Sequence, residues 1–423
     1  GLAINEAMVC GTAVIASTEC GAAHDLIDRN CGRLVPPGDA PALATILPEA
    51  LENSRSLGEN ARLRMAKWDF DADIRPLNIL FVAELAPGSR SYQRIRRLQM
   101  MGHSVETLSL VPPDATYETK PRLIDRIRHR LRYPQDRSGA NDRLRNLPAE
   151  PRPDIIWFER ATTVPGATLR AIKQAHPDCK LIWYAEDDMM NPAHLSRQVA
   201  SAIPFYDLWV TTKSFNTRPE ELPSLGAKSM LFVNNAYDIE AHSPIELSGT
   251  DRQNFAADIS FVGTWEHPRA ETVRQLAEAG LSVRIWGNGW ERMVDPPASL
   301  DIAYKPVYGD DYRRVVSASK INLCFLRRGN RDLQTCRSFE IPAIGGFMMH
   351  EFSVEMSQIL PPDQGAVYFD NETDLPRLCR FWLEHPENRE KIAAAGRTEL
   401  LTAGHEHEDR LREILEAATG EGD

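Results

Sequence analysis

The stretch LNILFVA at residues 77–83 decides how the surrounding sequence is interpreted. A short apolar run of this kind, followed by the Gly/Ser-containing loop at 87–89, is typical of a buried strand. The loop leads into an amphipathic segment that ends near Gly102, and a second strand pattern covers 104–110. A strand, a loop, a helix and another strand at this spacing form a βαβ unit, which predicts a parallel sheet.

The same rhythm continues along the chain and starts again once. Apolar strand patterns follow at 154–158, 180–184, 208–212 and 230–233, and then, after Asn234, at 259–262, 283–286, 321–325, 347–350 and 367–369. We therefore predict an α/β protein with two Rossmann-like domains, at 77–235 and 236–400, whose parallel sheets face an interdomain cleft. A charged C-terminal helix and tail follow at 401–423.

Residues 1–75 predict a smaller and incomplete α/β element. Its expected strands and helices cover 13–16, 32–35, 41–51 and 57–67. Asp39 is placed to cap the first of the two helices, because a carboxylate at this position accepts a hydrogen bond from the first helical turn. So few elements leave one face of a sheet uncovered, which indicates a fragment of a domain.

Composition restricts the classes of function. The chain has 423 residues, of which 42% are hydrophobic, and a formal net charge of -11. Such a chain lacks the basic footprint of a general nucleic-acid-binding protein, so we expect no nucleic-acid partner. No apolar run reaches the roughly 20 residues that a membrane helix needs. The seven cysteines are scattered and have no C-x-x-C spacing, which indicates a reducing, cytoplasmic location without a zinc site or disulfides.

The first segment resembles the C-terminal end of the group 1 glycosyltransferases. The residues that carry this resemblance are Glu6, the stretch CGTAVIAS at 10–17, Gly21 and the stretch GRLVPPGD at 32–39. That family has two glutamates eight residues apart; Glu6 corresponds to the second, and the position of the first would precede Gly1. The resemblance implies that this segment, 1–75, is a truncated piece that is catalytically inactive by itself.

Residues 77–415 are similar to the CgeB-like (spore-maturation type) glycosyltransferases. The motifs that carry the similarity are ISFVG at 259–263, IWGNGW at 285–290, SKINL at 319–323, CRSFEIPAIGGF at 336–347 and REKIAAAG at 389–396. The similarity implies the GT-B fold of two Rossmann-like domains. It also implies transfer of a sugar from a nucleotide-sugar donor to a glycan, lipid-linked or protein acceptor, with no cofactor besides the donor.

Candidate donor-binding residues come from the second predicted domain. A carboxylate can accept hydrogen bonds from both ribose hydroxyls, and the resemblance assigns this role to Glu340, in a helix after a strand and a loop. An acid near a helix start is also favoured by the helix dipole alone. Asp332, eight residues earlier, corresponds to the family's sugar-facing glutamate but has a shorter side chain, and it is a candidate catalytic residue.

A diphosphate needs cations or the free amides at a helix start. The resemblance indicates Arg269, Lys320 and Arg337 for this role, although Thr264 replaces an arginine of the group 1 loop. Arg337 can equally pair with Glu340 on one helix turn, and Lys320 equally suits a solvated strand end. Glycines that permit close backbone approach to a ligand are Gly263, Gly345 and Gly346.

The first predicted domain offers residues for the acceptor. Ser89, Arg90 and Ser91 follow the first strand, in the loop that related enzymes use near the acceptor and the donor phosphates. Asp187 follows a later strand at the carboxyl edge of the sheet, where ligands bind, and it is a candidate general base. A helix-capping role explains Asp187 equally well.

Two further features concern metals and membranes. The D-x-D pattern within 69–73 lies in a linker and not at a strand end, so we expect no metal site. Residues 122–132 (RLIDRIRHRLR) predict a basic amphipathic helix with Leu123, Ile127 and Leu131 on one face. This helix suits peripheral contact with an anionic membrane or a lipid-linked acceptor, and it also suits a solvated helix packed on the domain.

Two other functions remain consistent with the sequence. The departures at Thr264 and Asp332 also fit a catalytically inert relative that keeps the fold and has a surface or assembly role. A GT-B sugar-nucleotide epimerase is the other alternative, and it would need no acceptor. Analysis of the products formed from the donor alone distinguishes these alternatives from a transferase.

Overall fold

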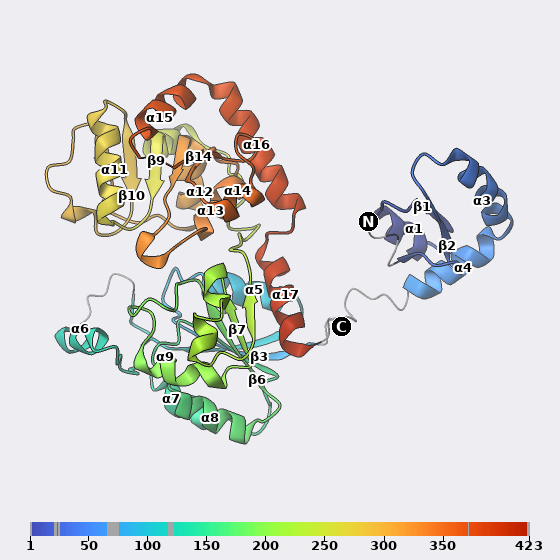
Figure 1. The fold of residues 1–423 in the computed structure, drawn as a ribbon, viewed down its shortest axis with the longest axis horizontal. Coiled ribbons are helices and arrows are strands. Elements are labelled where there is room, and N and C mark those ends of the chain that lie inside the picture. Colours follow the sequence, from blue (N-terminus) through green and yellow to red (C-terminus); the bar gives the residue numbers. More distant parts are fainter. Residues whose placement is uncertain are drawn as a thin grey trace. The chain divides into compact units, whose positions relative to one another are not determined.

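The computed structural model describes residues 2–20, 23, 26–65, 76–116, 122–370 and 372–420. The chain divides into two compact units, Gly1–Leu77 and Asn78–Asp423, and each is described by itself. Their helices and strands are drawn in Figure 1.

The smaller unit is built on a two-stranded parallel sheet. Its strands and helices are α1 (Leu2–Val9), β1 (Val14–Ser17), β2 (Gly32–Val35), α3 (Ala40–Glu52) and α4 (Ser54–Met65). Apolar side chains such as Met8, Leu26 and Ala61 form its small core. The Asp39 carboxylate accepts a hydrogen bond of 2.9 Å from the Ala42 amide, which confirms the predicted cap of α3.

The first sheet of the larger unit has six parallel strands in the order β4-β3-β5-β6-β7-β8. They are β3 (Asn78–Ala83), β4 (Ser104–Ser109), β5 (Ile155–Glu159), β6 (Lys180–Ala185), β7 (Leu208–Thr211) and β8 (Met230–Phe232). We call this sheet and its helices the first lobe. The chain places β4 on one side of β3 and β5 on the other, so the topological switch point lies between β3 and β5.

The second sheet also has six parallel strands, in the order β11-β10-β9-β12-β13-β14. They are β9 (Ala257–Val262), β10 (Val283–Trp286), β11 (Leu300–Ile302), β12 (Ser319–Cys324), β13 (Met348–Glu351) and β14 (Val367–Phe369). This sheet and its helices form the second lobe. Its strand order is that of a dinucleotide-binding Rossmann fold, and its switch point lies between β9 and β12.

Helices connect most of the successive parallel strands, as parallel pairing requires, and further helices follow the last strand, β14. They are α5 (Ser91–Met100), α6 (Leu123–Arg130), α7 (Ala140–Arg145), α8 (Gly166–Ala175), α9 (Arg197–Ala202), α10 (Gly249–Phe255), α11 (His267–Glu278), α12 (Gly309–Ala318), α13 (Cys336–Ile344), α14 (Val354–Ile359), α15 (Leu375–Glu384), α16 (Pro386–Thr402) and α17 (His407–Thr419). The sheets are therefore buried, and Trp183 and Trp209 stack at 4.9 Å inside the first lobe while Trp290 is fully buried in the second.

The last helix, α17, returns to the first lobe. Figure 1 shows it running from the second lobe alongside the first, and it contacts α5, β6 and β7 there. Arg97 on α5 pairs with Glu406 at 2.5 Å and with Glu408 at 3.5 Å, and Leu411 and Ile414 are buried. This helix follows the second lobe in the sequence, but its apolar face packs on the first lobe.

Candidate functional site

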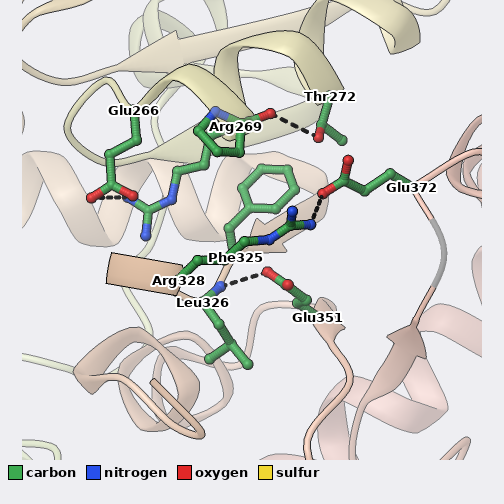
Figure 2. A pocket seen from close by; sticks show the side chains of 9 residues that line it. Glu266, Arg269, Thr272, Phe325, Leu326, Arg328, Glu351 and Glu372 are labelled. Atoms are coloured by element: carbon green, nitrogen blue, oxygen red, sulfur yellow. Dashed lines mark hydrogen bonds and ion pairs between the residues drawn. The ribbon is translucent and has the colours of Figure 1, made fainter. Parts of the chain in front are cut away.

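A small pocket lies at the switch point of the second lobe, where the carboxyl ends of β9 and β12 meet. Its lining residues are Glu266, Pro268, Arg269, Thr272, Phe325, Leu326, Arg328, Glu351 and Glu372. Figure 2 shows Arg269 directed toward Glu266, and Arg328 directed toward Glu372. Ligands of open α/β sheets bind in this position, because strand ends, loops and helix starts converge there.

Arg269 lies in the first turn of α11 and is only 4% exposed. Its Nη1 atom is 3.5 Å from the carbonyl of Thr264 and 3.8 Å from the carboxylate of Glu266. Its Nε and Nη2 atoms are buried without a hydrogen-bond partner in the described part of the chain. Burial, together with the positive charge of Arg337, lowers the pKa of Arg269 to about 10. The site therefore holds a positive charge that an anion would stabilise.

Arg337 supplies a second positive charge, from the first turn of α13. Its Nε atom is also buried without a partner among the residues described. The carboxylate of Glu340 is paired instead with Arg90 and His242, so the alternative Arg337–Glu340 pair is not formed in the described part of the structure. Two helix starts and two incompletely paired arginines thus lie near each other, which is the arrangement a diphosphate needs.

Glu340 is 6% exposed, and its ionic contacts with described residues are loose. Its Oε1 atom is 3.8 Å from Nη1 of Arg90 and 3.8 Å from Nε2 of His242. The Nδ1 atom of His242 accepts a hydrogen bond of 2.9 Å from the Asp238 amide, so in the neutral ring Nε2 carries the proton and faces Glu340. Burial lowers the pKa of His242, which keeps this ring neutral. Glu340 can therefore accept hydrogen bonds from a ligand.

The loop after β3 is joined to two glutamates of the first lobe, Glu159, which is buried, and Glu186, which is partly exposed. Arg90 donates to Glu186 at 3.0 Å, Ser91 donates to Glu159 at 2.6 Å, and Arg94 binds both carboxylates. Burial opposes ionisation of Glu186, but the charges of Arg90 and Arg94 hold its pKa well below its usual range. Ser91 is thus part of a structural network, whereas Arg90 links this network to Glu340 of the second lobe.

Ser89 lies in the turn that precedes α5, and its hydroxyl accepts a long hydrogen bond of 3.4 Å from the Ser91 amide. Its side chain is not buried. Of the three residues predicted in this loop, Arg90 is therefore the one that reaches the second lobe.

The two candidate catalytic aspartates lie where the lobes meet. Asp187 is paired with Arg327 at 3.2 Å and lies 3.8 Å from His194. Asp332 pairs with Lys213 at 2.7 Å, and both side chains are almost completely buried. In this conformation Asp332 joins the lobes and has no open face toward a sugar, whereas Asp187 remains partly exposed.

Three of the predicted donor-site residues lie elsewhere. Lys320 is at the amino end of β12, exposed and paired with Asp258 at 2.7 Å. Gly345 ends α13 with a φ of 90°, and a Cβ on Gly346 would approach Val316 to 2.5 Å. Both glycines precede β13, so they too lie at the edge opposite the pocket, where they permit helix termination and close packing.

Gly263 does lie at the carboxyl end of β9. A Cβ at this position would come within 2.5 Å of the buried Phe261 ring, so glycine is required for packing. Its carbonyl accepts a hydrogen bond of 2.9 Å from Nε1 of Trp290. Packing therefore accounts for Gly263 without a ligand contact.

Sequence reasoning missed the residues that pair with the predicted ones. Lys213 and Arg327 follow β7 and β12 at their carboxyl ends, so the rule that selected Asp187 also points to them. His242 had no such signal, because it follows no strand directly. Arg331 was missed for the same reason; it binds Asp188 and Glu221 across the lobes.

Among the residues described, no three His, Cys, Asp or Glu side chains are grouped as metal ligands. The D-x-D pattern of 69–73 lies outside the described residues. None of the helices in the described ranges is long and apolar enough to cross a bilayer.

Two families match the chain in sequence. Residues 269–416 match a family described as "Glycosyl transferase-like", and residues 1–66 match "Glycosyl transferases group 1". The first match includes most of α11, all of α13 and the pocket arginines Arg269 and Arg328. No curated protein matches the chain significantly in sequence.

Solved structures show the same architecture. Sucrose-phosphate synthase from Thermosynechococcus elongatus aligns with a TM-score of 0.56 at 12% identity, over 82% of this chain and 100% of its own. A glycosyltransferase from Rickettsia africae aligns with a TM-score of 0.56 at 11% identity, over 82% and 99%. Anabaena HepE in complex with UDP aligns with a TM-score of 0.52 at 11% identity, over 81% and 100%.

The larger unit therefore has the GT-B fold of two Rossmann-like domains, as predicted. The two family matches add the class of activity, and the chain is a glycosyltransferase.

Proposed function

We propose that the protein transfers a sugar from a nucleotide-sugar donor, bound in the second lobe, to a glycan, lipid-linked or protein acceptor. The observation that carries this proposal is the pair Arg269 and Arg337, two arginines with buried, unpartnered nitrogen atoms at the sheet switch point. A buried cation without a partner is costly, so such a pair is retained where an anionic ligand compensates it.

The donor is proposed to bind with its diphosphate against these arginines and the starts of α11 and α13. Glu340 then accepts hydrogen bonds from the ribose hydroxyls. This donor class is supported by HepE, which has been solved with UDP and with UDP-glucose. A further neighbour is an alpha-glucosyltransferase in complex with UDP-glucose and DNA containing an abasic site, at a TM-score of 0.55 and 13% identity.

On the acceptor side, we propose Asp187 as the group that contacts or deprotonates the acceptor hydroxyl. Its carboxylate is partly exposed at the carboxyl edge of β6 and faces Arg327 of the other lobe. The leaving diphosphate is stabilised by arginines in this scheme, so transfer needs no metal ion. Transfer that stops on addition of EDTA and returns with Mg²⁺ or Mn²⁺ would contradict this part.

The chain is further proposed to belong to the CgeB-like branch. The motif at 336–347 supports this assignment, because it forms α13 and supplies both Arg337 and Glu340. The group 1 match at 1–66 concerns the separate smaller unit.

The test is a panel of UDP-, GDP-, dTDP- and ADP-sugars, with thermal shift and diphosphate release as readouts. We expect nucleotide sugars with one particular base to stabilise the protein. Glu340→Gln should weaken the binding of that donor about 10- to 100-fold, because charge-assisted hydrogen bonds are lost. Lys320→Ala is the matched control, because its ion pair with Asp258 lies at the opposite sheet edge.

Three outcomes would contradict the transferase proposal. If no donor in the panel binds, the donor site is wrong. Donor binding without transfer or hydrolysis would favour the inert relative. Conversion of the donor sugar in the absence of acceptor would favour the epimerase.

A further inference from the structure

The helix α6 presents its apolar face to solvent. Large apolar side chains are 48% to 71% exposed at four positions, Leu123, Ile124, Ile127 and Leu131, and no residue of the helix is buried in the described structure. Elsewhere the lobe buries side chains of this kind in its core. The apolar face of α6 is therefore open to solvent and is not part of this core in the described structure.

Charge is arranged on both sides of the apolar face. At 100° per residue, the four apolar residues fall within an arc of about 100°. Arg126 and Arg130 border this arc on one side and Arg128 on the other. The segment 122–132 has five arginines and one aspartate, a net charge of +4, whereas the whole chain carries -11.

The helix is held in this orientation by the first lobe. Arg132 adopts a φ of 59° just after α6, and its Nε and Nη2 atoms donate to the Leu195 carbonyl at 2.9 and 2.6 Å. Asp125, on the face opposite the apolar arc, pairs with Arg137 at 2.6 Å. The amide of Arg197 donates to the Arg132 carbonyl at 2.8 Å. The polar face is thus tied to the protein and the apolar face is directed outward.

We propose that α6 docks the protein on an anionic lipid bilayer. The apolar arc enters the boundary between headgroups and acyl chains, and the flanking arginines contact anionic headgroups. Tyr133, 57% exposed, extends the surface with a ring suited to the headgroup level. A membrane fits this surface better than a protein groove, because the apolar arc is short and is bordered by cations on both sides.

The anchor of α6 also lies near the proposed acceptor side. Leu195, which binds Arg132, directly follows His194, and His194 lies 3.8 Å from Asp187. Docking through α6 therefore brings the first lobe, which holds the proposed acceptor residues, to the membrane. Docking itself needs no donor or acceptor, so it is tested independently of the proposed transfer.

The experiment is sedimentation of the full chain with vesicles of phosphatidylcholine, alone or with about 30% phosphatidylglycerol. We expect binding to the anionic vesicles at least about tenfold stronger than to the neutral ones, and release in about 0.5 M NaCl. Leu123→Ser/Ile127→Ser and, separately, Arg126→Gln/Arg130→Gln should each reduce binding about tenfold or more. All four side chains are exposed in the described structure, so both variants should keep the wild-type melting temperature.

The matched control is Val294→Ser/Val354→Ser, which removes two aliphatic side chains of the second lobe that are 74% and 62% exposed. It should bind anionic vesicles like the wild type. Absence of binding by the wild type, equal binding to neutral vesicles, or full binding by either α6 variant would overturn the proposal. Self-association in sedimentation velocity that Leu123→Ser/Ile127→Ser abolishes would also overturn it, because a second copy would then occupy this face.

Discussion

Replacing Arg269 with methionine is expected to stabilise the ligand-free protein and to remove its response to a nucleoside diphosphate. Methionine retains apolar volume beside Phe261 but removes the buried charge. Burial and the charge of Arg337 lower the pKa of Arg269 to about 10, so the folded state disfavours the charged form by about 3.5 kcal/mol, at about 1.4 kcal/mol per pKa unit. The substitution removes this penalty.

The substitution also removes one favourable contact, the guanidinium 5.7 Å from the centre of the Phe261 ring, which contributes about 0.5–1 kcal/mol. The 3.8 Å approach to Glu266 is already included in the lowered pKa. The net gain is then about 2–3 kcal/mol, which corresponds to a rise in melting temperature of roughly 4–12 °C for a lobe of about 200 residues.

Thermal shift with the cognate nucleoside diphosphate measures the second part of the prediction. At about 100 times Kd, the wild type gains about 2.7 kcal/mol from the ligand. Loss of the charge-assisted hydrogen bonds of Arg269 costs about 1.5–3 kcal/mol of binding, so the gain falls to roughly 0.3–1.3 kcal/mol. Arg274→Met is the control on the same helix, because the hydrogen bonds of the Arg274 side chain to described residues go to the carbonyls of Val294 and Asp295.

One result would refute the reasoning directly. If Arg269→Met lowers the melting temperature of the ligand-free protein while the nucleotide response stays at the wild-type level, Arg269 is a structural arginine. The positive charge at the switch point would then not serve a diphosphate.

Three other substitutions test the packing of the larger unit. Lys213→Met leaves the buried charge of Asp332 without its 2.7 Å partner and should destabilise the folded protein by about 3–5 kcal/mol in urea unfolding. The double variant Lys213→Met/Asp332→Asn should regain part of this stability. An unchanged urea midpoint in Lys213→Met would show that this pair does not join the lobes. Burial lowers the pKa of His405 from 6.5 to about 4, so the stability that this group contributes is present above pH 6.5 and is lost as the pH falls toward 4. The loss is about 2 kcal/mol at pH 5, and His405→Gln should reduce the fall in melting temperature between pH 7 and pH 5. If the melting temperature of the variant falls as steeply with pH as that of the wild type, His405 is not the group responsible. Gly263→Ala places a Cβ 2.5 Å from the Phe261 ring and should destabilise by about 1–3 kcal/mol, and a variant as stable as the wild type would show that the ring moves freely.

The strands and most helices follow from local sequence patterns. The apolar run at 77–83 forms β3, and Asp39 caps α3 as its position predicts. These features depend on residues close together in the chain, so hydrophobic periodicity and capping rules reach them. The helix α6 was predicted for the same reason.

The candidate site was less predictable, because its residues come together from distant strand ends. The family resemblance indicates Arg269, Arg337 and Glu340 as donor-binding residues. The structure brings the two arginines to the same charged site. The carboxylate of Glu340 lies instead 3.8 Å from Arg90 and from His242. Lys320 was grouped with them because it belongs to a motif, but motif membership does not say which end of a strand a residue occupies. The ion pair with Asp258 shows that Lys320 is at the amino end.

The sequence by itself determined the fold class, the parallel sheets and the class of chemistry, because repeating apolar strands and family motifs are local properties. Only the tertiary structure decided which charges lie side by side and which are already paired. Asp332 meets Lys213, 119 positions earlier, and Arg269 is left without a full set of partners. Pairing and burial across the lobes are set by packing, and packing determines which charges remain available to a ligand.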